Sequence, residues 1–194
     1  MTVTNTLKDW FETFWKILIL PTSGTFSEES EKAKGKFSSA IGWAIFIAIY
    51  SFVISIIAGI NFNADLFIIA MLIFPILVVL LPSATHFVLQ RFFHQKQYLY
   101  DRLLYIFTAI LVLFQLIITP VTFFAPSTIV RLANYFVIAY QLVLFIIAIK
   151  SIARIKYWQA IITTIITAFA GILIFICTLP VIFSLIGSVS STRR

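Results

Sequence analysis

The chain has 194 residues, of which 61% are apolar and only 11% are charged, whereas a soluble domain averages about 45–50% apolar and about 25% charged residues. With a mean hydropathy of +1.07, it has more apolar side chains than one soluble core of this size can bury. Composition excludes a soluble nucleotide-binding domain, a disordered chain and, with Cys177 as the one cysteine, a disulfide scaffold. We expect an integral membrane protein.

The first predicted element is an amphipathic helix over residues 7–19, which Pro21 ends. Its aromatic and aliphatic residues recur at helical spacing, and charged residues occupy the other face, as is typical of a helix lying in the membrane interface. The candidate interface residues are Trp10, Phe11, Phe14, Trp15 and Lys16. The same aromatic face could pack on a helical bundle, and the sequence leaves both interpretations open. The polar stretch 22–36 is expected to be a linker.

Five later stretches have the length of about 20 apolar residues that a helix needs to cross about 30 Å of hydrocarbon. They lie at residues 37–60, 66–88, 103–124, 129–149 and 157–187. The last is long for one crossing, so we expect a tilt, or a bend at Pro180. None alternates as a barrel strand does. The expected fold is all-α, with a five-helix transmembrane bundle preceded by an amphipathic interfacial helix.

The formal net charge of +7 reports on topology. In a five-span arrangement most basic residues fall on one side of the membrane: Lys8, Lys16, Lys32, Lys34, Lys36, Arg91, Lys96, Arg102, Lys150, Arg154 and Lys156. The other side has Arg131, Arg193 and Arg194. Because cytoplasmic loops retain Lys and Arg, we expect a plasma-membrane protein with a cytoplasmic amino terminus and an extracytoplasmic carboxyl terminus.

This topology divides the chain into a cytoplasmic helix and linker (1–36), a transmembrane domain (37–188) and a short extracytoplasmic tail (189–194). The basic residues of the inner loops lie at the bilayer edge. They are suited to anionic inner-leaflet lipids, at about 1 kcal/mol per residue, rather than to nucleic acid.

Small residues that recur at steps of three or four predict a helix-packing face in the first span, made of Ala40, Ala44, Ala48, Ser51, Ser55 and Gly59. A similar face in the fifth span is made of Ala160, Thr164, Ala168 and Gly171. Asp65 and Arg131 are the opposite charges that flank the outer loops, and we expect them to pair.

No catalytic, cofactor-binding or metal site is expected. His86 and His94 lie eight residues apart with no cysteine nearby, which is a poor set of metal ligands. Gln115, Asn134 and Gln141 lie in otherwise apolar helices and are expected to form interhelical hydrogen bonds.

Several features follow one another along nearly the whole chain: a Trp-rich start, Pro21 and Phe26 as Pro-x-x-x-x-Phe, a basic second loop running into 98–105, a span ending at Pro120, and a basic loop 150–156 before Trp158. This layout resembles the Yip family, the Ypt-interacting-protein domain membrane proteins. The resemblance implies a five-helix bundle with a cytoplasmic amino terminus. Eukaryotic relatives act with Rab-type GTPases through a longer cytosolic segment and carry an Asp-Leu-x-Gly-Pro signature.

This chain has neither the longer segment nor that signature, so the resemblance does not extend to GTPase binding and fits the short prokaryotic form. Some prokaryotic members are similar to accessory subunits of export systems. The leading hypothesis is a noncatalytic scaffold or accessory protein that binds membrane partners or organises lipid. The alternative is a small transporter, channel or lipid-handling protein. Kinks at Pro75, Pro82 and Pro180 and the polar residues Gln115, Asn134 and Gln141 would then surround a path. A membrane enzyme would have only the two histidines to use.

Overall fold

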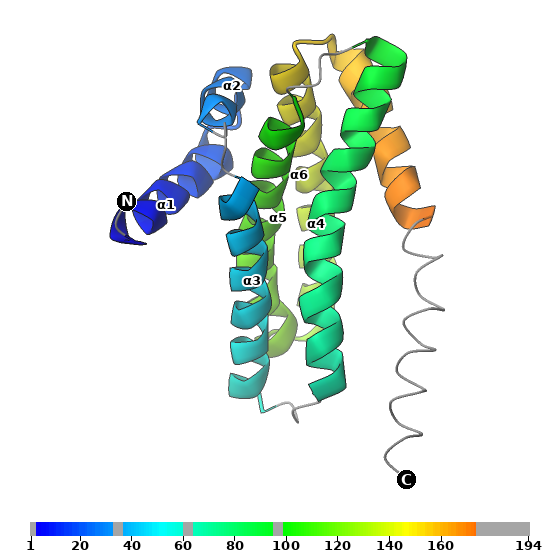
Figure 1. Ribbon diagram of the computed structural model, residues 1–194. Helices are drawn as coiled ribbons and strands as arrows, with labels where there is room; N and C mark the ends of the chain where they lie inside the picture. Colours follow the sequence, from blue (N-terminus) through cyan, green and yellow to red (C-terminus); the bar gives the residue numbers. More distant parts are fainter. Residues whose placement is uncertain (1–2, 33–36, 60–63, 95–98, 174–194) are drawn as a thin grey trace.

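The computed structural model describes residues 3–32, 37–59, 64–94 and 99–173. The described chain is helical, which confirms the all-α prediction (Figure 1). The helices are α1 (Val3–Ile19), α2 (Ser23–Glu31), α3 (Phe37–Ile57), α4 (Ala64–Phe93), α5 (Tyr100–Phe124), α6 (Ser127–Ala153) and a final helix, Tyr157–Leu173.

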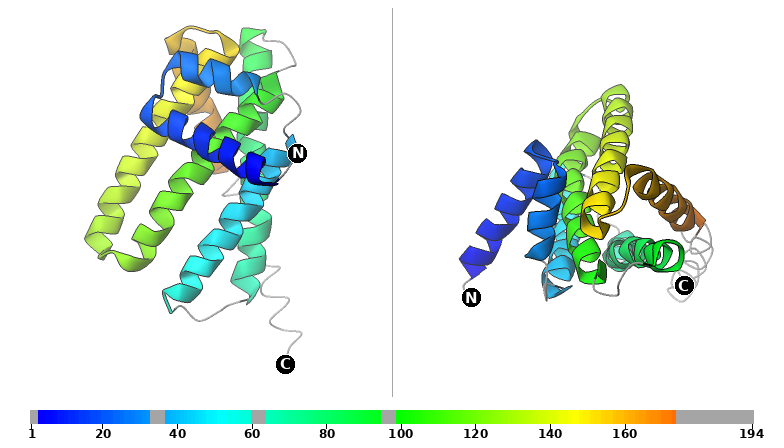
Figure 2. Two further views of the ribbon diagram at one scale, coloured as in Figure 1. Left: turned by 90° about the vertical axis from the view of Figure 1, so that its left-hand side faces the viewer. Right: turned by 90° about the horizontal axis from the view of Figure 1, so that it is seen from above.

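The helices from α3 onward run up and down beside one another, whereas α1 and α2 form a hairpin that crosses one end of this bundle (Figures 1 and 2). We call α1, α2 and residues 20–22 the hairpin, and the end that carries it the hairpin end. Helix α5 contacts α1, α2, α3, α4 and α6, and most of its side chains are buried. It is therefore the central helix of the described bundle.

Three helices are long and apolar enough to cross a membrane by length and composition, namely Ser38–Ile57, Tyr100–Phe124 and Ser127–Ala153. Their exposed surfaces are rich in large apolar side chains, including Ile49 on α3 and Leu132 and Phe136 on α6. Such surfaces are costly in water and indicate a membrane-embedded protein. Two shorter apolar helical segments are Val78–Phe93, the later part of α4, which begins in the second predicted span and continues beyond it, and Tyr157–Leu173 in the fifth.

The predicted first span ends at residue 60 and α3 at Ile57, and the other described helices begin up to three residues before the predicted spans. The predicted bend at Pro180, the rest of the fifth span and the tail 189–194 lie outside the described residues, as do Lys34, Lys36, Lys96, Arg193 and Arg194.

The stretch expected to be a polar linker is instead mostly helical. Thr22 caps α2, because its hydroxyl oxygen accepts a hydrogen bond from the Thr25 N–H at 3.2 Å. One side of this short helix buries Phe26, Glu29 and Ser30. The polar composition of this stretch does not predict a packed helix, because only one large apolar residue, Phe26, fixes α2 to the bundle.

The small-residue face of α3 packs on the bundle along its first half. Ala40 and Ala44 are fully buried and form a cluster with Val78 of α4 and Leu104 of α5. Farther along, Ser51 lies 3.4 Å from the Thr119 hydroxyl, and the Ser55 hydroxyl donates to the carbonyl of Phe52 in its own helix.

The last residue of the predicted face, Gly59, lies beyond the end of α3 and is exposed. Its φ of +74° is a left-handed conformation that suits glycine and ends the helix, so it does not extend the packing face. Ala48, by contrast, lies within α3 and is half-buried.

The small residues of the final helix face α4. Ala160 is fully buried, and the hydroxyls of Thr167 and Thr85 share a hydrogen bond between the two helices at 3.2 Å. A Cβ atom on Gly171 would lie 3.3 Å from Cδ2 of Leu81, so glycine allows this close approach.

A hydrogen bond between helices compensates for the proline inside α5. Pro120 has no N–H, so the carbonyl of Leu116, four residues earlier, loses its usual helical donor. The Tyr50 hydroxyl of α3 donates to this carbonyl at 3.1 Å. Tyr50 therefore supplies the donor that the proline removes, as a nonpolar environment requires.

Candidate membrane-interface site

Helix α1 lies across α5 at the hairpin end, and its aromatic residues divide between the bundle and the surface. Trp43 of α3 is fully buried, and its ring centroid lies 5.3 Å from Trp10, 5.2 Å from Phe14 and 4.7 Å from Tyr105. Edge and tilted arrangements of this kind are favourable for aromatic rings. We call these four residues the aromatic cluster; it fixes α1 against α3 and α5.

The other aromatic residues of α1 are free of the bundle. Phe11 is 72% exposed and Trp15 is 66% exposed, and Ile19 and Leu20 continue this apolar surface to the turn of the hairpin. The bundle-packing interpretation thus holds for Trp10 and Phe14. Phe11 and Trp15 are exposed, and their place in a membrane interface stays a prediction.

A buried carboxylate joins the two helices of the hairpin. The side chain of Glu29 is fully buried, and its carboxylate oxygens accept hydrogen bonds from the Thr13 hydroxyl at 2.9 Å and from Nζ of Lys32 at 2.8 Å. Nζ of Lys16 lies 3.5 Å away, and the Tyr105 hydroxyl of α5 lies 3.4 Å from the Thr13 hydroxyl. A buried charge is tolerated when it is paired and hydrogen-bonded in this way.

Lys16 is the centre of the charges along the hairpin. Its Nζ also lies 3.0 Å from Glu12 and 3.6 Å from Glu28. The hydrogen bond and the positive charge of Lys16 lower the pKa of Glu12, and the hydrogen bond to Glu12 is the largest cause that raises the pKa of Lys16. Lys16, which the sequence predicts to lie at the membrane interface, therefore pairs with glutamates of the hairpin.

Polar contacts to α6 hold the other side of the hairpin. Nζ of Lys150 donates to the Ser23 hydroxyl at 3.0 Å, and the Ser151 hydroxyl donates to the Ser23 carbonyl. The Tyr140 hydroxyl donates to the carbonyl of Leu18 at 3.2 Å. The hairpin is thus attached to α3, α5 and α6 at fixed points rather than through a flexible link.

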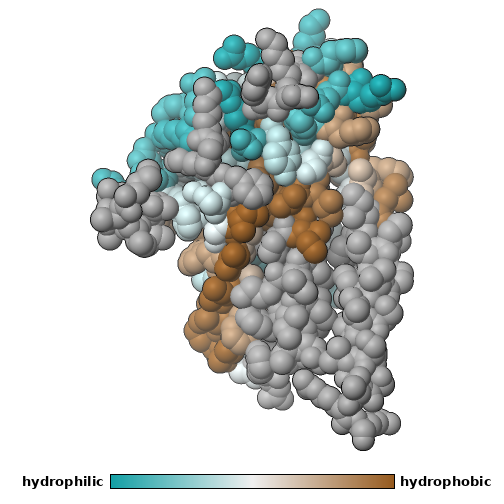
Figure 3. All heavy atoms as spheres, viewed as in Figure 1, coloured by the Kyte–Doolittle hydropathy of each residue, from teal (hydrophilic) through white to brown (hydrophobic). Residues whose placement is uncertain are grey.

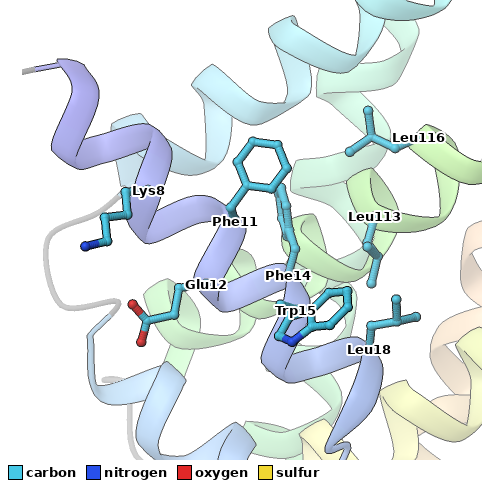
Figure 4. A pocket seen from close by; sticks show the side chains of 8 residues that line it. All are labelled: Lys8, Phe11, Glu12, Phe14, Trp15, Leu18, Leu113 and Leu116. Atoms are coloured by element: carbon cyan, nitrogen blue, oxygen red, sulfur yellow. The ribbon is translucent and has the colours of Figure 1, made fainter.

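Between α1 and α5 lies an open apolar groove of about 520 Å³, which we call the α1 groove (Figure 4). It is lined by Lys8, Phe11, Glu12, Phe14, Trp15, Leu18, Leu113 and Leu116. Figure 4 shows the aromatic side chains of α1 on the side of Leu113 and Leu116, and Lys8 and Glu12 at the opposite edge of the helix.

The hairpin end gathers the polar surface of the molecule. In Figure 3 the hydrophilic residues gather at this end, and the coloured residues below it are mostly hydrophobic. The basic residues Arg91, Arg102, Arg154 and Lys156 lie at the helix ends that meet here, whereas Arg131 lies near the start of α6, at the other end. The described part of the chain therefore has the charge asymmetry that the sequence indicates.

Other predicted residues lie apart from this site. His86 is half-buried, with its ring centroid 5.8 Å from that of Tyr100, and His94 is exposed just after α4 with φ +52°. Among the described residues no cluster of three metal-ligating side chains occurs. The pair of Asp65 with Arg131 involves a side chain outside the described part of the structure, so it stays a prediction.

The predicted polar residues Gln115, Asn134 and Gln141 are half-buried. The interhelical hydrogen bonds that the structure describes come from other side chains, notably Tyr50, Thr85 and Tyr140. A cavity of about 70 Å³ between α4, α5, α6 and the final helix is largely apolar and has room for a few water molecules.

No family model, curated protein or solved structure matches this chain. The resemblance to the Yip family therefore rests on the layout of the sequence.

Sequence reasoning did not identify the buried carboxylate of Glu29, its partner Thr13, or the groove leucines Leu113 and Leu116. Glu29 stands among other glutamates in a segment that has the composition of a solvated linker. The available signal is the threonine cap at Thr22 followed by Phe26, which together predict a short docked helix.

Proposed function

We propose that this chain is a noncatalytic integral membrane protein of the Yip type that organises lipid and holds membrane partners from its cytoplasmic face. In this proposal the five helices from α3 onward cross the plasma membrane, and α1 lies in the inner interface. The amino terminus is cytoplasmic and the carboxyl terminus extracytoplasmic.

The observation that carries the proposal is the fixed position of α1. Its inner aromatic residues attach it to the bundle and Glu29 attaches it to α2, while Phe11 and Trp15 stay exposed beside the apolar body. Exposing two large aromatic side chains to water is unfavourable, whereas the boundary between headgroups and acyl chains suits them. A rigidly held interfacial helix displaces lipid on one leaflet.

The charges of the hairpin end support the proposed orientation. Exposed Arg91, Arg154 and Lys156 would face the anionic inner leaflet, which attracts basic residues at about 1 kcal/mol each. The Yip resemblance adds the expectation of membrane-protein partners at this face. Some prokaryotic members of that family are similar to accessory subunits of export systems, and a partner-binding role of that kind is the one proposed.

The alternative of a small channel or transporter receives less support from the described bundle. The cavity that the described residues form between α4, α5, α6 and the final helix is small and largely apolar. The hydroxyls of Thr85 and Thr164 that line it donate to carbonyls of their own helices at 2.9 Å. Of the alternative functions, lipid handling is the one that the α1 groove favours.

The proposal is tested by reconstituting the purified protein into vesicles that contain anionic phospholipid. Bilayer order is followed with a polarity-sensitive dye and vesicle shape by electron cryomicroscopy. We expect the protein to change order or shape, and the double variant Phe11→Ala, Trp15→Ala to lose most of this effect. The matched control is Tyr135→Ala, Phe136→Ala, which removes two equally exposed aromatic residues from α6.

A wild-type protein that leaves both bilayer properties unchanged, and that also copurifies with no reproducible membrane protein from native membranes in mild detergent, would contradict the proposal. Equal loss in the α1 and α6 variants would show that general exposed aromatic area, rather than α1, produces the effect.

A further inference from the structure

The α1 groove has the size and lining of a ligand site rather than of a packing defect. Its volume of about 520 Å³ falls within the range of about 300–1,000 Å³ that is usual for small-molecule pockets. One wall is formed by Leu113 and Leu116 of α5, and the other by the aromatic side chains of α1. A flexible hydrocarbon chain fits such a lining, because it offers mainly apolar contact.

The two charged residues that line the groove, Lys8 and Glu12, have opposite charges and lie at the outer edge of α1 (Figure 4). Glu12 is paired with Lys16 at 3.0 Å, so its charge is compensated within the hairpin. Lys16 and Lys32 are both held by glutamates, whereas Lys8 forms no salt bridge within the described residues. The cation that the groove leaves for a ligand is therefore Lys8, which is exposed.

We propose that the α1 groove binds one anionic phospholipid of the surrounding leaflet, with an acyl chain along Leu113 and Leu116 and the phosphate group paired with Lys8. The inference rests on the proposed interfacial position of α1, since a lipid reaches the groove only at that depth. It turns the general affinity for anionic lipid into a single site with a defined headgroup contact.

Native mass spectrometry tests this site. The full chain is extracted in mild detergent from vesicles with equal amounts of phosphatidylglycerol and phosphatidylcholine, and retained lipids are identified. We expect one retained phosphatidylglycerol per wild-type chain. Lys8→Gln is expected to weaken its retention about fivefold, as the loss of one lysine near a membrane surface implies, and Lys8→Arg to restore it.

Two variants fill the groove, so that the test does not depend on the folding of one. Leu116→Trp and Leu18→Trp each place a large ring in the space and should abolish retention. The controls are Leu132→Trp on the exposed face of α6 and Lys156→Gln at the hairpin end, which should both retain the lipid.

Retention that is indifferent to the headgroup, or that survives both filling variants when they are folded, would overturn the inference. So would a dimer in place of a lipid-bound monomer, because a second copy would then cover the groove. If the lipid is lost in the filled variants while their effect on bilayer order persists, both proposals stand. A retained lipid in a protein without any bilayer effect would refute the proposed function alone.

Discussion

Replacing Tyr50 with phenylalanine should destabilise the bundle only as long as Pro120 is present. The Tyr50 hydroxyl donates to the Leu116 carbonyl at 3.1 Å, and this carbonyl lacks a helical donor because Pro120 has no N–H. Hydrogen bonds between membrane helices contribute about 0.6 kcal/mol on average and up to about 1.7 kcal/mol. An unsatisfied buried carbonyl costs about 1–3 kcal/mol. For this half-buried contact we expect Tyr50→Phe to lower the free energy of unfolding by about 1 kcal/mol.

The double-mutant cycle with Pro120→Ala makes this reasoning specific. Alanine restores the N–H at position 120, so in that background the Leu116 carbonyl regains its donor within the helix and Tyr50→Phe should cost almost nothing. Unfolding is measured by circular dichroism during titration with a denaturing detergent. The control Tyr135→Phe removes a hydroxyl from an exposed tyrosine and should change stability by less than about 0.5 kcal/mol. An equal cost of Tyr50→Phe in both backgrounds would refute the compensation.

Two further predictions concern the hairpin. Glu29→Ala leaves Thr13 and Lys32 without their acceptor and should weaken hairpin docking by about 1–3 kcal/mol. This should appear as faster amide exchange in α1 and α2 but not in α5. Exposed Glu31→Ala is the control, and equal protection in both variants would contradict the buried cluster. The lowered pKa of Glu12 means that its pair with Lys16 stabilises the hairpin above the unfolded value of 4.5 and is lost as the pH falls through the lower folded value. The pKa of Lys16 is raised, so its contribution is fully present below the unfolded value of 10.5 and is lost as the pH rises through the higher folded value. Hydrogen exchange of α1 should therefore be constant from pH 5 to 9 after correction for intrinsic rates. Loosening of α1 that begins near neutral pH would contradict this pairing.

The sequence predicts the helices well because their signal is local. Apolar runs and helical spacing locate α1 and the later helices to within a few residues in most cases, and small residues such as Ala40 and Ala44 mark where α3 packs. Periodicity reports which residues share a face, so it also identifies the aromatic face of α1.

What the sequence does not reveal depends on contacts between distant segments. Trp10 and Trp15 lie about 140° apart around the helix, at the two sides of its aromatic face. The sequence does not say which side meets the bundle, and the fold places Trp10 against Trp43 of another helix and leaves Trp15 exposed. Glu29 resembles its neighbours until Thr13 and the lysines surround it. The α1 groove exists only because α1 crosses α5, and no local pattern encodes that crossing.

The depth of α1 in a bilayer shows directly whether this helix lies in the membrane interface. In a Cys177→Ser background, single nitroxide labels at Lys8→Cys, Phe11→Cys and Trp15→Cys are compared by electron paramagnetic resonance in vesicles with anionic phospholipid. We predict that the labels at positions 11 and 15 are accessible to oxygen and protected from a water-soluble nickel reagent, whereas the label at position 8 is accessible to nickel. Nickel accessibility at all three positions would place α1 in water and contradict the account.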